Sequence, residues 1–342
     1  MPPRPASPNA ARLRRPAHAP KTRLARGPLS YSPSVADLAD GDERVHLESA
    51  PSAAGLARVA EALGGGVVEG VVRLGGGLDC ATHRFELGRR SFVLKRAKPG
   101  SDGIGDEFEN LRFAKPCRVP TPEPIACDAN GEWFGTPALI MSTLPGTHNL
   151  FPDDLALWVG QLAKALAAIH DTPVPGFPTR HPSRLDRWEP WTSEPDERVT
   201  AISGVVRELR VHADPSAWVF SHDDFHPGNC VFTEDLLTGV VDWAHATLEP
   251  RASAVAFCRK DLAIHPGGDT PDRFLAAYEA ENGARVEDMD LWDILQGAGG
   301  LQWGHRWPPA FREVGVELNA GDVVDASARF VDDALIRRRL GR

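Results

Sequence analysis

The chain has 342 residues, with 38 basic and 47 acidic side chains and a net charge of −9. Hydrophobic residues make up 42% of it and charged residues 25%, which excludes a wholly disordered or collagen-like protein. No apolar run approaches the roughly 20 residues that a membrane-spanning helix needs, so we expect no membrane association. The acidic balance also argues against a general nucleic-acid binder.

The N-terminal segment 1–36 has a composition of its own. It contains no Asp or Glu, six Arg, one Lys and eight of the 30 prolines, so its charge is +7 and the remainder carries −16. Because its few apolar side chains cannot offset the entropy of ordering, we predict a disordered basic tail over residues 1–45 that can be deleted without loss of function. An organelle transit peptide and a misassigned start codon are the alternatives. The transit peptide is disfavoured because the prolines break an amphipathic helix.

The five cysteines are odd in number, are widely spaced and never form a Cys-x-x-Cys pair: Cys80, Cys117, Cys127, Cys230 and Cys258. This spacing argues against both a disulfide framework and a structural zinc site. We therefore expect five free thiols and a reduced, cytoplasmic location.

Residues 46–143 have the pattern of a small β-rich lobe. Alternating apolar residues predict strands at 67–74, 81–88 and 91–97, and two further strands within 124–142 that are joined at Asn130-Gly131. Helices are expected at 53–63 and 106–115, and prolines end the second one.

Residues 144–342 have a mainly helical pattern. Apolar residues recur at helical spacing in six segments, namely 154–170, 195–212, 252–265, 271–283, 286–303 and 323–340. One short hairpin, with strands at 230–232 and 239–243, interrupts them. The expected fold class is therefore α+β, with a small β-rich lobe, a hinge and a larger helical lobe.

The segment SHDDFHPGNCVF (221–232), followed by GVVDW (239–243), carries the most chemistry. A proline and a glycine keep the loop from forming a helix, and the hairpin that follows brings Asn229 and Asp242 side by side. An amide oxygen and a carboxylate form a hard oxygen site that suits Mg²⁺. Asp224 remains available to accept a proton from an attacking hydroxyl. Phosphoryl transfer uses a base of this kind together with ligands for a metal ion.

The upstream half supplies a cradle and a cation for the phosphates. A glycine run between two strands leaves backbone N–H groups open to phosphate oxygens, at Gly75, Gly76 and Gly77. Lys95 lies in an apolar strand of a chain with six Lys and 32 Arg. Val93 shares its face, so that Val93 covers a base while Lys95 reaches the phosphates. Glu107 in the next helix is the expected partner of Lys95, and Glu109 is the alternative.

Together these motifs resemble those of the aminoglycoside phosphotransferase family and its choline-kinase-like relatives, which have a protein-kinase-like fold. The resemblance runs from about residue 67 to about residue 283, and it rests on LGGG, VLK, VPTPEPI, IMSTLPG, HDDFHPGN and VVDW. It implies transfer of the γ-phosphate of ATP, with Mg²⁺, to a hydroxyl of a small molecule.

The resemblance also implies roles for individual residues. Asp224 would be the catalytic base, and Asn229 and Asp242 would be the Mg²⁺ ligands. Lys95 and the glycine loop would hold the ATP phosphates, with Glu107 as the partner of the lysine. The backbone of the hinge would read adenine, at Met141, Ser142 and Thr143.

Two positions depart from the family pattern. Relatives usually carry an Asp in the helix after the returning strand, near Ala254, where this chain reads RASAVAFCR. Asp223 occupies a position where Gly is common, and its carboxylate is expected to raise the pKa of Asp224 or to join the metal shell. These departures motivate an alternative function, a nucleotide-binding pseudokinase that regulates a partner.

The acceptor is expected to be a small molecule rather than a protein. Asp223 stands where many protein kinases have an Arg, and only about ten residues separate Asp242 from the next helix, which is too few for a long activation segment. The charge of −16 also favours a cationic acceptor, attracted by Glu194, Asp261 and Asp293.

Several aromatic and histidine residues have two interpretations. His222 and His226 are expected to hydrogen-bond the loop, and a metal-dependent hydrolase that uses them with His245 or His265 is the less favoured rival. Five tryptophans of the helical part either line an acceptor pocket or, as we favour for most of them, pack in the core: Trp188, Trp191, Trp292, Trp303 and Trp307.

Overall fold

The computed structural model describes residues 48–340, with gaps at 76–79, 99–102, 179–182 and 193–195. All of the described residues belong to one compact unit, Asp42–Arg342. The expected tail 1–45 lies outside them, as do Gly76 and Gly77 of the glycine run. The described cysteines are free thiols, as expected.

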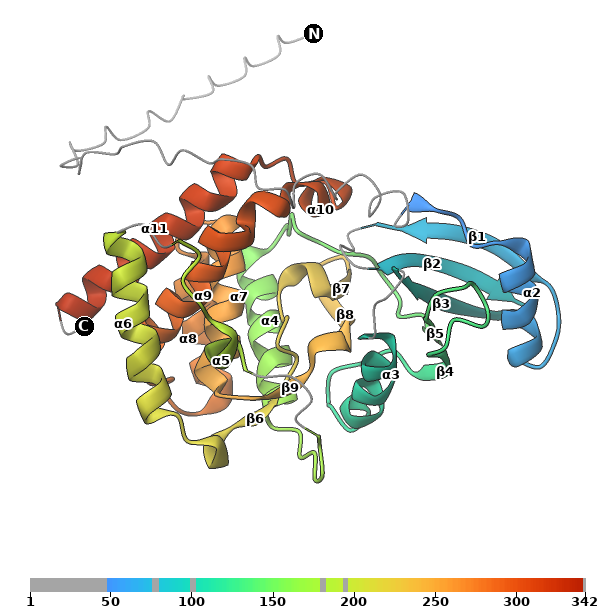
Figure 1. Cartoon of the computed structure of the whole chain (residues 1–342), viewed down its shortest axis with the longest axis horizontal. Helices are drawn as coiled ribbons and strands as arrows, with labels where there is room; N and C mark the ends of the chain where they lie inside the picture. Colours follow the sequence, from blue (N-terminus) through green and yellow to red (C-terminus); the bar gives the residue numbers. More distant parts are fainter. Residues whose placement is uncertain (1–47, 76–79, 99–102, 179–182, 193–195, 341–342) are drawn as a thin grey trace, which may run out of the picture. The chain divides into compact units, whose positions relative to one another are not determined.

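A five-stranded antiparallel sheet forms the β-rich part of the protein (Figure 1). Its strands, β1 (Val68–Leu74), β2 (Cys80–Leu87), β3 (Arg90–Ala97), β4 (Pro124–Asp128) and β5 (Ala138–Ser142), lie in the order β1-β2-β3-β5-β4. Each corresponds to a predicted strand, and a tight turn joins β2 to β3 as expected.

The connection between β4 and β5 is longer than the turn that the sequence predicts at Asn130-Gly131. It is longer because its aromatic residues pack against the sheet instead of continuing a strand. The Asp128 carboxylate accepts a hydrogen bond from the backbone N–H of Trp133 at 2.6 Å. A Cβ added to Gly55 would lie 2.1 Å from the Phe134 ring, so this connection also packs closely on the preceding helix.

The two faces of the sheet have different neighbours. Phe85, Phe92 and Leu94 on one face form a small core with Val59 of helix α2 (Ala53–Ala62). Val93 and Lys95 alternate with these residues along β3 and therefore point to the other face of the sheet. There Val93 packs against a second and larger hydrophobic core, which includes Leu139 and Met141 of β5. Helix α3 (Gly103–Ala114) also contributes to that core.

Among the described residues after β5, six helices have 13 or more residues, and all were predicted within a few residues. They are α4 (Leu155–His170), α6 (Glu197–His212), α7 (Arg251–Ile264), α8 (Thr270–Asn282), α9 (Met289–Trp303) and α11 (Ala320–Arg339). Helix α4 begins where the Asp154 carboxylate caps the backbone N–H of Ala156 and Leu157. Helix α9 packs between α11 and α7 (Figure 1).

Several shorter elements were not predicted. They are α5 (Arg184–Arg187), α10 (Pro308–Glu313), and the paired strands β6 (Val219–Ser221) and β9 (Thr247–Glu249). Each has at most six residues, which is too few to show a period in the sequence.

The predicted hairpin is present as β7 (Cys230–Thr233) and β8 (Leu236–Val240), but its second strand ends before Asp242. Asp242 has φ 65°, in the left-handed region, and precedes a 3₁₀ turn, Trp243–His245. Trp243 is fully buried, and its indole N–H donates to the carbonyl of Val240 at 2.9 Å. The strand prediction over 239–243 was therefore wrong at its end, because the buried Trp243 folds the chain back.

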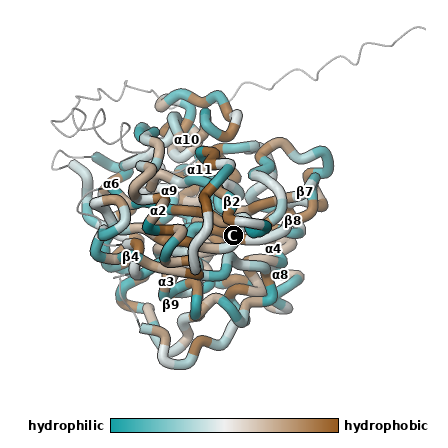
Figure 2. Tube along the Cα trace, turned by 90° about the vertical axis from the view of Figure 1, so that its right-hand side faces the viewer, coloured by the Kyte–Doolittle hydropathy of each residue, from teal (hydrophilic) through white to brown (hydrophobic). Residues whose placement is uncertain are grey.

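Along most of the trace, hydrophobic and hydrophilic residues alternate, as expected for elements with one buried face (Figure 2). Among the described residues, no helix has the length and apolar character to cross a membrane.

Candidate active site

The loop between β6 and β7 carries the HDDFHPGN motif, and its two histidines hold its shape. His222 is buried and donates from Nε2 to the carbonyl of Val241 at 2.9 Å, which ties the loop to the returning strand. His226 accepts the backbone N–H of Gly228 on Nδ1 at 3.1 Å and so caps the short turn at Pro227–Asn229. Both contacts are of the loop-supporting kind that the sequence predicts.

Asp224 and Asn229 face each other across this loop. The Asn229 amide nitrogen donates to the Asp224 carbonyl at 2.9 Å and to its Oδ2 at 3.1 Å. Burial raises the pKa of Asp224, but electrostatic attraction to His226 and Arg184 outweighs burial and brings the pKa to about 2. Asp224 is therefore ionised at neutral pH, the state in which a carboxylate can accept a hydrogen bond from a hydroxyl.

Asn229 and Asp242 lie on neighbouring backbones, as the hairpin predicts. The backbone N–H of Val241 donates to the Asn229 carbonyl at 2.9 Å. The amide nitrogen of Asn229 is bonded to Asp224, which leaves the amide oxygen of Asn229 as a metal ligand. Asp242 Oδ1 is bonded to Lys95, which leaves Oδ2 for the same purpose. This donor set fits Mg²⁺, which takes one or two protein oxygens together with phosphates and water. No group of three or more His, Cys, Asp and Glu gathers as a metal site within the residues that the structure describes.

Lys95 links this pair to helix α3. Its ammonium lies 2.5 Å from Glu107 Oε2 and 2.9 Å from Asp242 Oδ1, and its side chain is 9% exposed. Burial alone would lower the pKa of Lys95, but the two carboxylates outweigh it and hold the pKa well above its ordinary value. Glu109, the alternative partner, instead pairs with Arg112 at 3.1 Å on the outer side of the helix.

The remaining predicted nucleotide contacts follow strand β1 and end strand β5. Gly75 is the one residue of the glycine run that the structure describes, and a Cβ there would lie 3.1 Å from Glu313 Oε2 of α10. The hinge residues Met141 and Ser142 end strand β5, and Thr143 begins the connection to the helical part. Ser142 fixes this connection by accepting the backbone N–H of Glu123 on its hydroxyl at 2.8 Å.

Asn110 is a site residue that sequence reasoning missed. Its amide donates to the carbonyl of Trp243 at 2.9 Å and to that of Ala244 at 3.2 Å. It thereby holds the segment that follows Asp242. Its spacing of three from Glu107, which places both on one face of α3, was the available signal.

Asp223 has a different role from the one expected. It has φ 58°, a left-handed conformation, and is only 4% exposed. Two arginines of α5 bind its carboxylate, Arg184 at 2.8 Å and Arg187 at 3.1 Å. The expectation that Asp223 raises the pKa of Asp224 was wrong, because these arginines engage its carboxylate and the pKa of Asp224 falls. No sequence signal revealed the pairing, since Arg184 lies 39 residues away.

Ala254 is buried in α7, and the carboxyl group of Glu249 from β9 lies against the start of the loop. Glu249 is 1% exposed and accepts the Ser221 hydroxyl at 2.5 Å. Burial and the charge of Asp223 raise the pKa of Glu249 to about 7.

The residues expected to attract a cationic acceptor are placed differently. Asp293 is fully buried and bound at 2.9 Å by both Arg259 and Arg337, so it cannot face a ligand. Asp261 pairs with Lys260 at 3.1 Å, and Glu194 lies outside the described residues.

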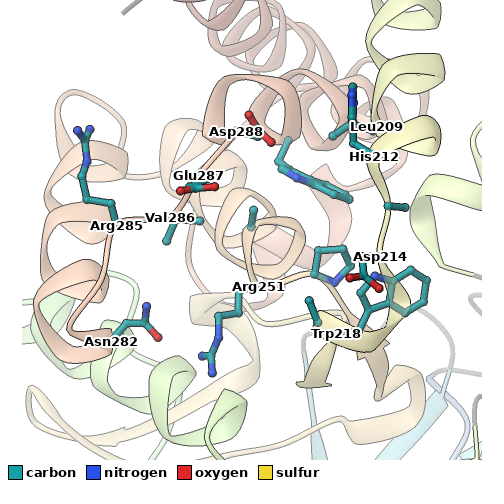
Figure 3. A pocket seen from close by; sticks show the side chains of 15 residues that line it. Leu209, His212, Asp214, Trp218, Arg251, Asn282, Arg285, Val286, Glu287 and Asp288 are labelled. Carbon is teal, nitrogen blue, oxygen red and sulfur yellow. The ribbon is translucent and has the colours of Figure 1, made fainter.

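A pocket of about 400 Å³ lies apart from the motif (Figure 3). Trp218 and Asp214 line one side of it, while Arg285 and Glu287 come from the connection between α8 and α9. Of the five tryptophans, Trp292 also lines this pocket and is 6% exposed. None of the predicted catalytic, nucleotide-binding or metal-binding residues lines it, so this pocket is separate from the Lys95–Asp224 centre.

The sequence matches one family model and several curated relatives. A family model described as phosphotransferase enzyme family matches residues 70–295. A homoserine kinase of Rhodospirillum rubrum is 29% identical over 162 residues, which are 43% of this chain and 50% of the relative. A homoserine kinase of Rhizobium meliloti is 24% identical over 209 residues, 55% of this chain and 61% of the relative. The chain thus spans about half to three-fifths of the length of these curated relatives.

Solved structures share the fold at low identity. A putative aminoglycoside phosphotransferase of Ralstonia eutropha superposes with a TM-score of 0.56 and 18% identity, covering 87% of this chain and 95% of that one. A choline kinase of Streptococcus pneumoniae gives 0.55 and 16%, covering 79% and 94%. The expected α+β, kinase-like fold is confirmed.

Proposed function

The chain belongs to the phosphotransferase enzyme family, and from that membership and the geometry around Asp224 we propose that it transfers the γ-phosphate of ATP to a hydroxyl of a small molecule. The observation that carries the proposal is a chain of contacts. Lys95 forms ion pairs with Glu107 and with Asp242, and a backbone hydrogen bond next to Asp242 connects it to the catalytic loop, which is the loop between β6 and β7. Such an array serves a reaction in which positioning and charge neutralisation supply most of the rate.

Each residue has a part that follows from its surroundings. Lys95 stays protonated and is fixed by Glu107, so it binds phosphate oxygens at a defined place. Asn229 and Asp242 would hold Mg²⁺, which neutralises charge on the phosphates when it is bound. Asp224 is ionised, so it orients the acceptor hydroxyl through a hydrogen bond. It takes the proton of that hydroxyl as the new P–O bond forms, while the bond from the γ-phosphorus to the bridging oxygen breaks and ADP leaves.

The acceptor belongs among small hydroxylated molecules. The curated relatives are named as homoserine kinases, and the structural neighbours include a choline kinase and an aminoglycoside phosphotransferase. We therefore propose a hydroxy amino acid or an amino alcohol as the first acceptors to examine. Both contain an amine, which is compatible with the negative charge of the chain.

The direct test is product formation from ATP over an acceptor panel of homoserine, choline, ethanolamine, serine and an aminoglycoside. Formation of a phosphate monoester, followed by phosphorus NMR and abolished by EDTA, is the expected result. Tight binding of Mg·ATP with transfer to none of the acceptors would instead favour the pseudokinase alternative. Hydrolysis of an ester with bound Zn²⁺ and no nucleotide would favour the hydrolase.

A further inference from the structure

Both oxygens of the Asp224 carboxylate have a partner in the structure. The Asn229 amide nitrogen lies 3.1 Å from Oδ2, and Nη2 of Arg184, in helix α5, lies 3.5 Å from Oδ1. Because each oxygen is held by a different residue, rotation of the carboxylate would break at least one of these contacts. The Asp224 side chain is 31% exposed, so part of it stays open to an acceptor hydroxyl.

Arg184 is itself held in place by two elements. Its Nε donates to Asp223 Oδ1 at 2.8 Å and to the Asp223 backbone carbonyl at 3.1 Å, and its Nη2 also donates to that carbonyl. Its guanidinium carbon lies 4.0 Å from the centroid of the Phe257 ring, in α7. Because a guanidinium is planar and rigid, these contacts determine where Nη2 meets Asp224. Arg184 therefore binds the peptide that joins Asp223 to Asp224 as well as the Asp224 side chain.

The backbone of Asp223 is an independent sign that this contact matters. Asp223 has φ 58°, a conformation that glycine adopts freely and that residues with a side chain adopt less readily. Its carboxylate is also buried, at 4% exposure, which is costly unless partners neutralise it. Residues in such conformations persist where the surrounding structure holds them, and they cluster at functional sites. The ion pairs of Asp223 with α5 explain why an aspartate occupies this position.

The two arginines of α5 have different contacts. Arg187 binds Asp223 Oδ2 at 3.1 Å, and its side chain is 44% exposed. Of the two arginines, only Arg184 also lies within ion-pair distance of Asp224 among the described residues. Both arginines therefore neutralise Asp223, but Arg184 also connects it to the expected base.

We propose that Arg184 is a positioning residue for phosphoryl transfer, an inference that rests on the proposed function. Through the Asp223 backbone and by direct contact, it fixes the Asp224 carboxylate at the place that the acceptor hydroxyl must reach. A nearby positive charge makes a carboxylate a weaker base, so the benefit of Arg184 comes from geometry and not from basicity. Geometry of this kind matters because a displacement of about 1 Å can cost about 10²-fold in rate.

The test is steady-state kinetics with Mg·ATP and the best acceptor of the panel, together with the Kd of Mg·ATP and the thermal unfolding midpoint. In Arg184→Gln, we expect kcat to fall by about 10²-fold, while the KM of the acceptor and the Kd of Mg·ATP change little. A folding defect would instead lower the unfolding midpoint and the fraction of the protein that binds Mg·ATP.

Arg187→Gln is the matched control, because Arg187 lies on the same helix and binds the same carboxylate. Its kcat should fall by about fivefold or less, which is the equivalent of an exposed ion pair. Arg184→Lys keeps the charge but lacks the planar fork, so its kcat should also stay far below the wild-type value. This variant decides the question if Arg184→Gln does not fold.

A double variant tests whether Arg184 acts through Asp223. Asp223→Asn combined with Arg184→Gln should lower kcat no further than Arg184→Gln alone, because both substitutions remove one shared contact. Losses that add in the double variant would overturn the role of Arg184.

The remaining outcomes separate the positioning role from the function. A kcat of Arg184→Gln or Arg184→Lys close to the wild-type value would overturn the positioning role, and so would equal losses in Arg184→Gln and Arg187→Gln. In each case, transfer by the wild type leaves the proposed function intact. Absence of transfer by the wild type to every acceptor would overturn the proposed function, and this inference with it.

Discussion

Adjacent acidic residues in the catalytic loop have opposite environments. Asp223 is buried and neutralised by two arginines, whereas Asp224 keeps 31% of its side chain exposed and faces the site. The motif alone predicts that Asp224, five residues before Asn229, is the base, and this assignment stays a prediction. It did not predict the state of Asp223, because the arginine partners come from a helix distant in sequence.

The buried carboxyl of Glu249 should make stability depend on pH. Its pKa is raised to about 7 by burial and Asp223, so the folded protein keeps a proton that the unfolded chain releases at lower pH. The stabilisation is therefore complete in acid and is lost as the pH rises through about 7. Glu249→Gln, which mimics the protonated form, should be less sensitive to this rise.

The measurement is the thermal unfolding midpoint of both proteins from pH 5 to pH 9. The wild type should lose stability relative to Glu249→Gln as the pH rises from 5 to about 7, and the difference should level off above that. Parallel curves for the two proteins would show that Glu249 does not titrate in this range.

At the scale of elements, the periodicity of apolar residues predicted the long helices and the five strands of the sheet. The short elements were missed, although α5 delivers Arg184 and β9 delivers Glu249 to the site. The importance of their residues depends on contacts with the catalytic loop that a sequence does not show, such as the hydrogen bond between Glu249 and Ser221. Helix α3 was predicted in part. The helix and its Lys95 partner were predicted, but it begins at Gly103, three residues before the predicted start, and its Asn110 contact was missed.

Helix α3 offers a matched pair of substitutions. Glu107→Gln removes the buried carboxylate that fixes Lys95 at 2.5 Å, and we expect kcat/KM for Mg·ATP to fall by about 10²-fold. Glu109→Gln, two residues along the same helix, removes only an exposed pair with Arg112 and should leave activity within about twofold. Steady-state kinetics of the two variants decide this. An equal effect of both would refute the positioning of Lys95 by Glu107.

At the scale of the whole molecule, the helical part is fastened by a buried ion network. Asp293 of α9 binds Arg259 of α7 and Arg337 of α11, and so joins three helices that are far apart in sequence. The periodicity predicted each helix and its buried face. It left Asp293 as a candidate for an acceptor site, because the sequence does not show which charges meet in the interior.

Removing Asp293 should therefore destabilise the protein without acting on the chemistry. Asp293→Asn leaves two arginines short of their partner, and we expect a loss of about 3–5 kcal/mol in the free energy of unfolding. Asp332→Asn, which breaks the exposed pair with Arg198, should cost about 0–1 kcal/mol. Urea denaturation compares the two. Equal midpoints would show that the buried network does not hold the helices together.

The central claim is that Asp224 acts on the acceptor hydroxyl while the Lys95–Asp242 array holds the nucleotide. The most direct measurement is single-turnover transfer of the γ-phosphate by the wild type and by Asp224→Asn, with the Kd of Mg·ATP determined for both. We expect transfer to fall by about 10³-fold or more in Asp224→Asn while the Kd changes little. Transfer at the wild-type rate by Asp224→Asn would contradict it.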